Sequence, residues 1–155
     1  MPPNELERIG ISRMAEREID AFLSSQGVGV LGLPAEDGPY LVPISFGFDG
    51  RDALYFTFVS GAKSRKRDLS ERSDCARFLV YRAPTPFSWQ SVVLSGSVDP
   101  VPDPDLSDLD DVMDNAWHPE VFDVAVSDDS ISVYRFDIET KAGRKQTGLP
   151  PGFEA

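Results

Sequence analysis

The stretch from Tyr55 to Tyr81, YFTFVSGAKSRKRDLSERSDCARFLVY, places one apolar segment on each side of a polar one. Aromatic and β-branched residues are frequent in 53–60 and in 75–84, so both segments are predicted to be strands. Between them, Ser64–Arg72 consists mainly of polar residues and good helix formers, which predicts a short helix. The order of strand, helix and strand indicates a β-rich fold with a helix beside the sheet.

The flanking sequence supplies four further predicted strands, each bounded by Gly, Pro or Asp residues: 27–34, 39–49, 87–101 and 130–138. The turns at 35–38 and 50–52 are short, so neighbouring strands are expected to run antiparallel. An amphipathic helix is predicted over 12–24, with Ser12 as its N-cap. We expect one domain, residues 1–155, built as a small closed or half-closed barrel of six antiparallel strands with flanking helices.

The segment 99–114 is acidic, with seven Asp residues and no Lys or Arg. Its apolar residues recur at helical spacing, which predicts an amphipathic helix over 105–117 with its acidic face in solvent. The spacing of the Asp residues lacks the Gly and the final Glu of an EF-hand loop. No calcium site is therefore predicted.

The chain has 155 residues, of which 26 are acidic and 15 are basic, so its formal net charge is -11. This charge argues against general nucleic-acid binding, because phosphate backbones require positive neutralisation. Many Asp and few Lys are typical of proteins from a high-salt cytoplasm, so we expect a halophilic protein with an acidic surface. No apolar run approaches the roughly 20 residues of a membrane helix, and the N-terminus lacks a signal-peptide pattern. A cytoplasmic location without membrane contact is expected.

Two residue types that often carry chemistry occur once each, as Cys75 and His118. A Cys-rich zinc site is therefore excluded, and no metal site is predicted. If the protein is an enzyme, its reactive atoms are expected to belong to a cofactor. Tyr40, Tyr55 and His118 are candidate proton donors that the sequence does not rank, so the catalytic residues stay unknown.

Four of the few basic residues stand in the run Lys63–Arg67. The first turn of a helix exposes unpaired backbone N–H groups and carries partial positive charge, so cations are unfavourable there. A bound phosphate would accept hydrogen bonds from the N–H groups and pair with the cations. The alternatives are a solvated basic helix and a nucleic-acid patch, and the acidity of the chain disfavours the second. A small molecule that carries a phosphate is the favoured partner.

Four short motifs follow one another along the chain: Phe56-Thr57, then Ser64-Arg65-Lys66 opening a helix, then the strand ARFLVY, and then Gln90 in a strand that reaches Gly96. Together they resemble the pyridoxamine 5'-phosphate oxidase-like flavoproteins, which are FMN-binding split barrels. It covers roughly Ile19 to Val101, with a weaker likeness at YRFDIETKAGRK. It implies a six-stranded antiparallel split β-barrel and a homodimer with the flavin at the interface.

The resemblance also implies a cofactor site made by four segments. The FMN phosphate would bind at the start of the helix, to Lys63, Ser64, Arg65 and Lys66. Thr57, which follows Phe56, would add a hydrogen bond near the phosphate or ribityl chain. The isoalloxazine ring would lie along Val42, Pro43, Ile44 and Ser45. Gln90 and Ser91 would approach the flavin from the second subunit.

The sequence departs from true pyridoxamine 5'-phosphate oxidases at its C-terminal segment, RKQTGLPPGFEA, which lacks their Trp-containing basic pattern. We therefore expect an FMN-dependent oxidoreductase that acts on another small molecule, rather than vitamin B6 oxidation. One alternative keeps the fold and uses the deazaflavin F420, whose phosphate would occupy the same site. A second alternative is a non-catalytic module that binds a flavin or haem.

Overall fold

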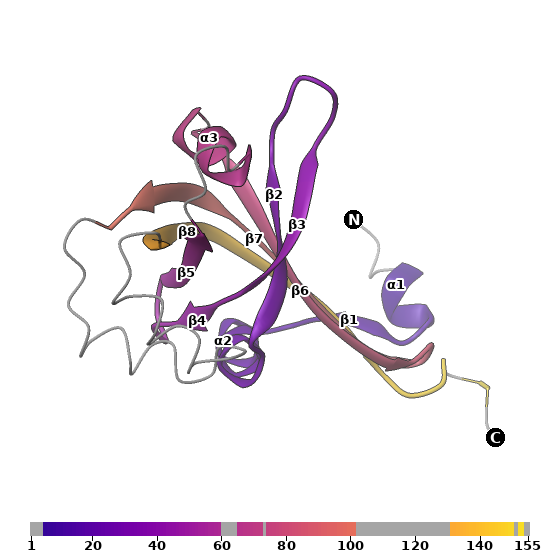
Figure 1. Ribbon diagram of the computed structural model, residues 1–155. Helices are drawn as coiled ribbons and strands as arrows, with labels where there is room; N and C mark the ends of the chain where they lie inside the picture. Colours follow the sequence, from indigo (N-terminus) through magenta and orange to yellow (C-terminus); the bar gives the residue numbers. More distant parts are fainter. Residues whose placement is uncertain (1–4, 60–64, 73, 102–130, 151, 154–155) are drawn as a thin grey trace.

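The computed structural model describes residues 5–59, 65–72, 74–101, 131–150 and 152–153 (Figure 1). The side chains of 58, 59, 65–67, 72 and 131 are not described. The elements, in chain order, are α1 (Glu5–Arg8), β1 (Ile11–Arg13), α2 (Glu16–Ser25), β2 (Val28–Leu33), β3 (Tyr40–Ser45), β4 (Gly47–Phe48), β5 (Ala53–Val59), α3 (Arg65–Arg72), β6 (Ala76–Thr85), β7 (Ser88–Pro100) and β8 (Ile131–Thr147).

The strands form one antiparallel sheet in the order β3-β2-β6-β7-β8-β5-β4, with β1 paired to β8 beside this path. The two ends of the path, β3 and β4, follow one another in the chain and are separated only by Phe46. The sheet therefore curls round on itself, and β6, β7 and β8 are its long central strands (Figure 1). This architecture confirms the prediction of a mainly β, antiparallel split barrel with flanking helices.

The described residues form eight strands, so the predicted count of six is wrong. The predicted strand 39–49 is divided at Phe46, because its first part pairs with β2 and its second part pairs with β5. Phe46 is fully buried, and its ring packs edge-on against Phe78 with centroids 5.2 Å apart. Phe46 thus fixes the chain at the point where it stops pairing with β2 and begins to pair with β5. The other additional strand is β1.

The last strand, predicted to end at Ile138, continues to Thr147 in the structure. It pairs with β7 along its length, while its opposite edge is shared by β5 and then by β1. A bulge at Glu139 interrupts the register with β7. A Cβ at Gly96, opposite this bulge, would lie 1.9 Å from the Asp137 carbonyl oxygen, so only glycine fits there. The sequence did not predict strand after Ile138, because the residues that follow are mostly polar.

The helix predicted over 12–24 begins later, at Glu16, and the N-cap is Ala15 rather than Ser12. Ser12 lies in β1, where its backbone is opposite Lys145 of β8. The Glu18 carboxylate accepts a hydrogen bond from the Ala15 N–H at 3.2 Å, which closes the first turn. The short helix after β5 is confirmed as α3. The predicted acidic helix over 105–117 lies outside the described residues.

The core lies on the inner face of the curled sheet. One row across five strands consists of residues that stand opposite one another: Val42, Leu31, Phe78, Leu94 and Lys141. The three central residues of the row are 0% exposed. A Cβ at Gly29 would lie 2.3 Å from the Phe78 ring, which explains a glycine within β2. α2 covers the β8 end of this face with Ile19, Phe22 and Leu23.

Candidate functional site

The basic run reaches α3, which begins at Arg65 after the end of β5. Arg65 and Lys66 therefore occupy the first turn of the helix, where backbone N–H groups lack partners within the helix. Leu69 packs against the core, and Ser70 is 2% exposed, so α3 is held against the sheet by its second half. Lys63 and Ser64 lie outside the described residues. The location of the helix start inside the run agrees with the predicted phosphate site, which stays a prediction.

The predicted flavin strand is β3, at one end of the sheet path. Val42 and Ile44 point inward and pack against the core, whereas Pro43 and Ser45 stand on the outer face. Within the described chain, β3 pairs with β2 alone, so its other backbone edge has no strand partner. Proline is tolerated on such an edge. Backbone N–H and C=O groups along an edge that no described strand pairs with suit a ligand with a polar ring edge.

The two predicted residues of β5 have different environments. Phe56 is 0% exposed and stacks on Phe78 with ring centroids 6.0 Å apart, so its side chain belongs to the core. Thr57 is half-buried and stands opposite Val133 of β8 on the other face. Of the pair, only the Thr57 side chain can face a ligand without repacking of the core.

Gln90 and Ser91 lie near the start of β7, opposite Arg82 and Tyr81 of β6. β6 begins at Ala76, four residues after the end of α3, and Ala76 stands opposite Gly96. Six residues of strand separate Gln90 from Gly96, which is a length of about 20 Å. The fold therefore does not bring Gln90 and Ser91 to the same end of the sheet as α3 within one chain.

The candidate proton donors are not gathered at one place. The Tyr55 hydroxyl accepts a hydrogen bond from the Arg135 guanidinium at 2.8 Å, and that guanidinium also lies over the Tyr55 ring. Tyr40 is half-buried at the start of β3, and His118 lies outside the described residues. In the described part of the chain, no three metal-ligating side chains form a group. No described helix is both long and apolar enough to cross a membrane.

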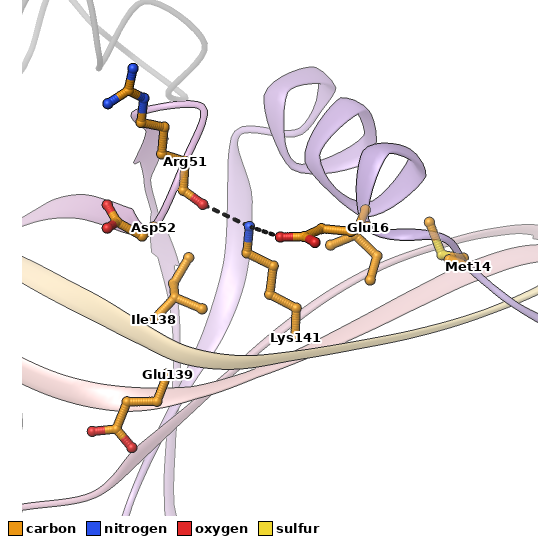
Figure 2. Close-up of a pocket in the computed structure, with 8 residues that line it drawn as sticks. Met14, Glu16, Arg51, Asp52, Ile138, Glu139 and Lys141 are labelled. Atoms are coloured by element: carbon orange, nitrogen blue, oxygen red, sulfur yellow. Dashed lines mark hydrogen bonds and ion pairs between the residues drawn. The ribbon is translucent and has the colours of Figure 1, made fainter.

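A pocket of about 400 Å³ that the sequence did not predict lies where the edge of β8 is uncovered between β5 and β1 (Figure 2). The Asp52 carbonyl accepts the Ile138 N–H on one side, and the Gly143 carbonyl accepts the Met14 N–H on the other. The walls come from β8, from the turn before β5 and from the start of α2. They are formed by Met14, Glu16, Ile19, Arg51, Asp52, Ile138, Glu139 and Lys141.

Lys141 links three segments across this pocket (Figure 2). Its ammonium donates to the Asp20 carboxylate at 2.7 Å and to the Arg51 carbonyl at 2.6 Å, and Glu16 lies 3.8 Å away. It also lies over the Phe48 ring, and its side chain is only 13% exposed. These partners satisfy the ammonium, so Lys141 is a cross-link of the fold. The partners of Lys141 come from distant parts of the chain, so no local sequence pattern predicted this cross-link.

Solved structures of three proteins share this fold at low sequence identity. A FAD-binding protein from Mesorhizobium loti has 21% identity and a TM-score of 0.71, over 90% of this chain and 99% of that chain. A FAD-binding protein from Mycobacterium smegmatis has 14% identity and a TM-score of 0.61, over 87% and 97%. A flavocytochrome from Azotobacter vinelandii has 18% identity and a TM-score of 0.69, over 94% and 73%.

Among curated proteins, no sequence matches this chain. The sequence model of the family described as pyridoxamine 5'-phosphate oxidase matches residues 15–145. That range begins at the N-cap of α2 and ends within β8, so it includes β3, α3 and the start of β7. The resemblance inferred from the short motifs is thereby confirmed over most of the chain, and this protein belongs to the pyridoxamine 5'-phosphate oxidase-like family.

Proposed function

We propose that this protein is a homodimeric flavin-binding oxidoreductase that holds the phosphate of FMN at the start of α3. The observation that carries the proposal is the start of α3 at Arg65, inside the run of four cations. A helix start supplies free N–H donors, and the cations supply charge, which together favour a phosphate. Lys63 and Ser64, directly before the helix, are proposed to complete the same site.

The residues of β3 and β5 fit a flavin as well. A flavin ring has one polar edge, and β3 offers a backbone edge that no described strand uses. Val42, Pro43, Ile44 and Ser45 would lie along the ring, with Thr57 near the ribityl chain. Because Val42 and Ile44 are held by the core, this edge would be rigid before the ligand binds.

The outer face of the sheet supports a homodimer. A second row of opposite residues runs across the same five strands and is entirely apolar: Pro43, Val30, Leu79, Val93 and Ala142. Val93 is 42% exposed, and the neighbouring Leu41 and Tyr81 are 67% and 60% exposed. An extended apolar patch of this kind marks an interaction surface. Ser91 stands opposite Arg144 and so projects from this outer face. A second copy docked there would bring the start of its β7, with Ser91 and the adjacent Gln90, toward the flavin.

The chemistry would belong mainly to the cofactor, because a bound flavin would supply the capacity for hydride transfer that the side chains lack. The residues of this chain would hold the phosphate at α3, orient the polar ring edge along β3 and exclude water from the core side of the ring. The substrate would be a small molecule.

The neighbours described as FAD-binding leave two flavins to distinguish, because FMN and FAD both carry a phosphate next to the ribityl chain. F420 also carries a phosphate. The absorbance spectrum of the purified protein, with the mass of the ligand released on denaturation, separates these cofactors. A flavin spectrum and the mass of FMN are expected. Bound flavin without turnover against any reductant would favour a non-catalytic module.

The phosphate assignment is tested by replacing Arg65 and Lys66 together with Ala. We expect FMN affinity, measured by flavin fluorescence titration at fixed ionic strength, to fall at least roughly 100-fold, because each lost charge-assisted contact is worth about 1.5–3 kcal/mol. The matched control replaces Arg8 and Arg17, two exposed helix arginines, with Ala and makes the same change in net charge. Equal FMN affinity in both double variants would exclude the site.

A further inference from the structure

Two arginines stand directly opposite one another on the outer face of the sheet. Arg13 of β1 is paired with Arg144 of β8, and Arg144 is paired on its other side with Ser91 of β7. Ser91 is in turn opposite Tyr81 of β6. Directly opposite residues of antiparallel strands project from the same face, about 5 Å apart. One line across four strands therefore carries two hydroxyl groups followed by two guanidinium groups.

This arrangement is unfavourable unless something negative lies beside it. Like charges directly opposite one another destabilise a sheet. The chain has 26 acidic residues against 15 basic ones, yet none is paired with either arginine in the part that the structure describes. Arg13 is exposed and Arg144 is half-buried, so both remain accessible.

The other face of the same strand shows what the chain does with cations that serve the fold. Lys141 is bound to Asp20, and Lys145 is bound to Glu18, so each inward-facing lysine of β8 has its own carboxylate from α2. Arg144, which lies between them in sequence, has another cation opposite it instead. In a chain with an excess of acidic residues, an arginine pair that has no acidic partner among the described residues indicates a binding site for an external anion.

We propose that Arg13 and Arg144 form a second anion-binding site, which takes the phosphate or carboxylate of a small molecule. Guanidinium groups bind both oxyanions through two parallel N–H···O bonds. An oxyanion between the two arginines would relieve their repulsion. The site is separate from the start of α3 and does not depend on the flavin assignment. It borders the apolar row at Val93 and Ala142, so it would remain at the rim of a dimer formed there.

The test must separate this site from the start of α3, which is also expected to bind phosphate. Inorganic phosphate and acetate are therefore titrated by calorimetry into the variant that carries Arg65→Ala and Lys66→Ala, at constant ionic strength. The same titrations are repeated after adding Arg13→Gln with Arg144→Gln, or the control Arg17→Gln, which removes a single exposed cation. Arg17 lies exposed on α2 and outside both proposed sites.

We expect saturable anion binding in the parent variant, a loss of affinity of at least about tenfold in the Arg13→Gln, Arg144→Gln form, and no change with Arg17→Gln. Tighter binding of phosphate would assign the ligand as a phosphate, and tighter binding of acetate would assign a carboxylate. Phosphate should also raise the melting temperature of the parent but not of the Arg13→Gln, Arg144→Gln form. Absence of binding of both anions to the parent, or equal affinities in all three proteins, would overturn the proposal.

Titration of FMN makes this outcome independent of the proposed function. In the wild-type background, the Arg13→Gln, Arg144→Gln form should bind FMN as the wild type does. If it loses FMN affinity as strongly as the Arg65→Ala, Lys66→Ala variant, the pair serves the cofactor itself, and a separate site is refuted.

Discussion

The two faces of the sheet carry neighbouring rows that differ by one residue on every strand. On the inner face, Leu31, Phe78 and Leu94 are fully buried. On the outer face, the adjacent Val30, Leu79 and Val93 are also apolar but keep contact with solvent. An antiparallel sheet with one solvated face normally alternates apolar and polar residues. The absence of that alternation across these strands agrees with the proposed homodimer, in which the core covers one face of the sheet and a second copy covers the other.

The comparison is tested most strongly by the pair Phe78→Ala and Leu79→Ala. Phe78 contacts the Phe46, Phe56 and Phe136 rings, so its truncation should lower the free energy of unfolding by about 4 kcal/mol. This loss should be independent of protein concentration, whereas the smaller loss from Leu79→Ala should grow as the wild type associates. Chemical denaturation at two protein concentrations measures both. Equal, concentration-independent losses would mean that Leu79 is an ordinary core residue.

The second test places a charge in the middle of the outer row. Leu79→Glu should leave the far-ultraviolet circular dichroism unchanged and weaken self-association at least about 100-fold, or about 2.8 kcal/mol. Sedimentation equilibrium measures the change, with Ala21→Glu on the exposed side of α2 as a control of equal charge. If the wild type stays monomeric at high concentration, the outer apolar row is not a homodimer interface.

The third test compares the cations of β8. Lys141→Met removes the cross-link between α2, β8 and the turn before β5, and leaves Asp20 without its partner. We expect a loss of about 2 kcal/mol, because the pair is only partly buried. Arg144→Gln should instead gain about 0.5 kcal/mol in phosphate-free buffer, since it relieves repulsion from Arg13. Destabilisation by both changes in urea unfolding would show that Arg144 has a structural partner.

The smallest effect is expected for Glu18→Gln, in the partly buried ion pair with Lys145. The hydrogen bond from Lys145, aided by the Ala15 N–H, holds the pKa of Glu18 below its ordinary value of 4.5. A carboxylate with a lowered pKa stabilises the fold fully above pH 4.5, and this contribution disappears as the pH falls through the lowered pKa. Thermal melts from pH 3 to pH 7 should therefore show a small difference from wild type that vanishes at the acidic end. A difference that persists there would point to a lost contact rather than a lost charge.

The sequence predicted the class of fold and most strands, because alternating apolar residues and short turns are local signals. The Asp49 turn is an example, since its carboxylate accepts hydrogen bonds from the N–H groups of Arg51, Asp52 and Ala53. The division of a strand at Phe46 was missed because a change of partner leaves no mark on periodicity. β1 and the second half of β8 were missed because their polar residues become strands only by pairing with each other and with β7.

The candidate site was predicted only in part, because the sequence reveals local features but not contacts between residues that are far apart along the chain. The start of α3 could be placed because a helix following a strand and a basic run are local features. The burial of Phe56 could not be foreseen, because it depends on Phe78 from another strand. The pairing of Arg13 with Arg144 spans nearly the whole chain, and only the register of β1 on β8 reveals it.

The three partners of β8 have a consequence for how the protein is made. β1, β5 and β7 all pair with the strand Ile131–Thr147, so none of them has its full set of neighbours until that segment has left the ribosome. Until then the nascent polypeptide leaves the β8-facing edges of β5 and β7 without a strand partner, and unpaired edges promote aggregation. Contacts between such distant positions also slow folding. Synthesis of this chain should thus pass through a long unprotected interval in which chaperones are most needed.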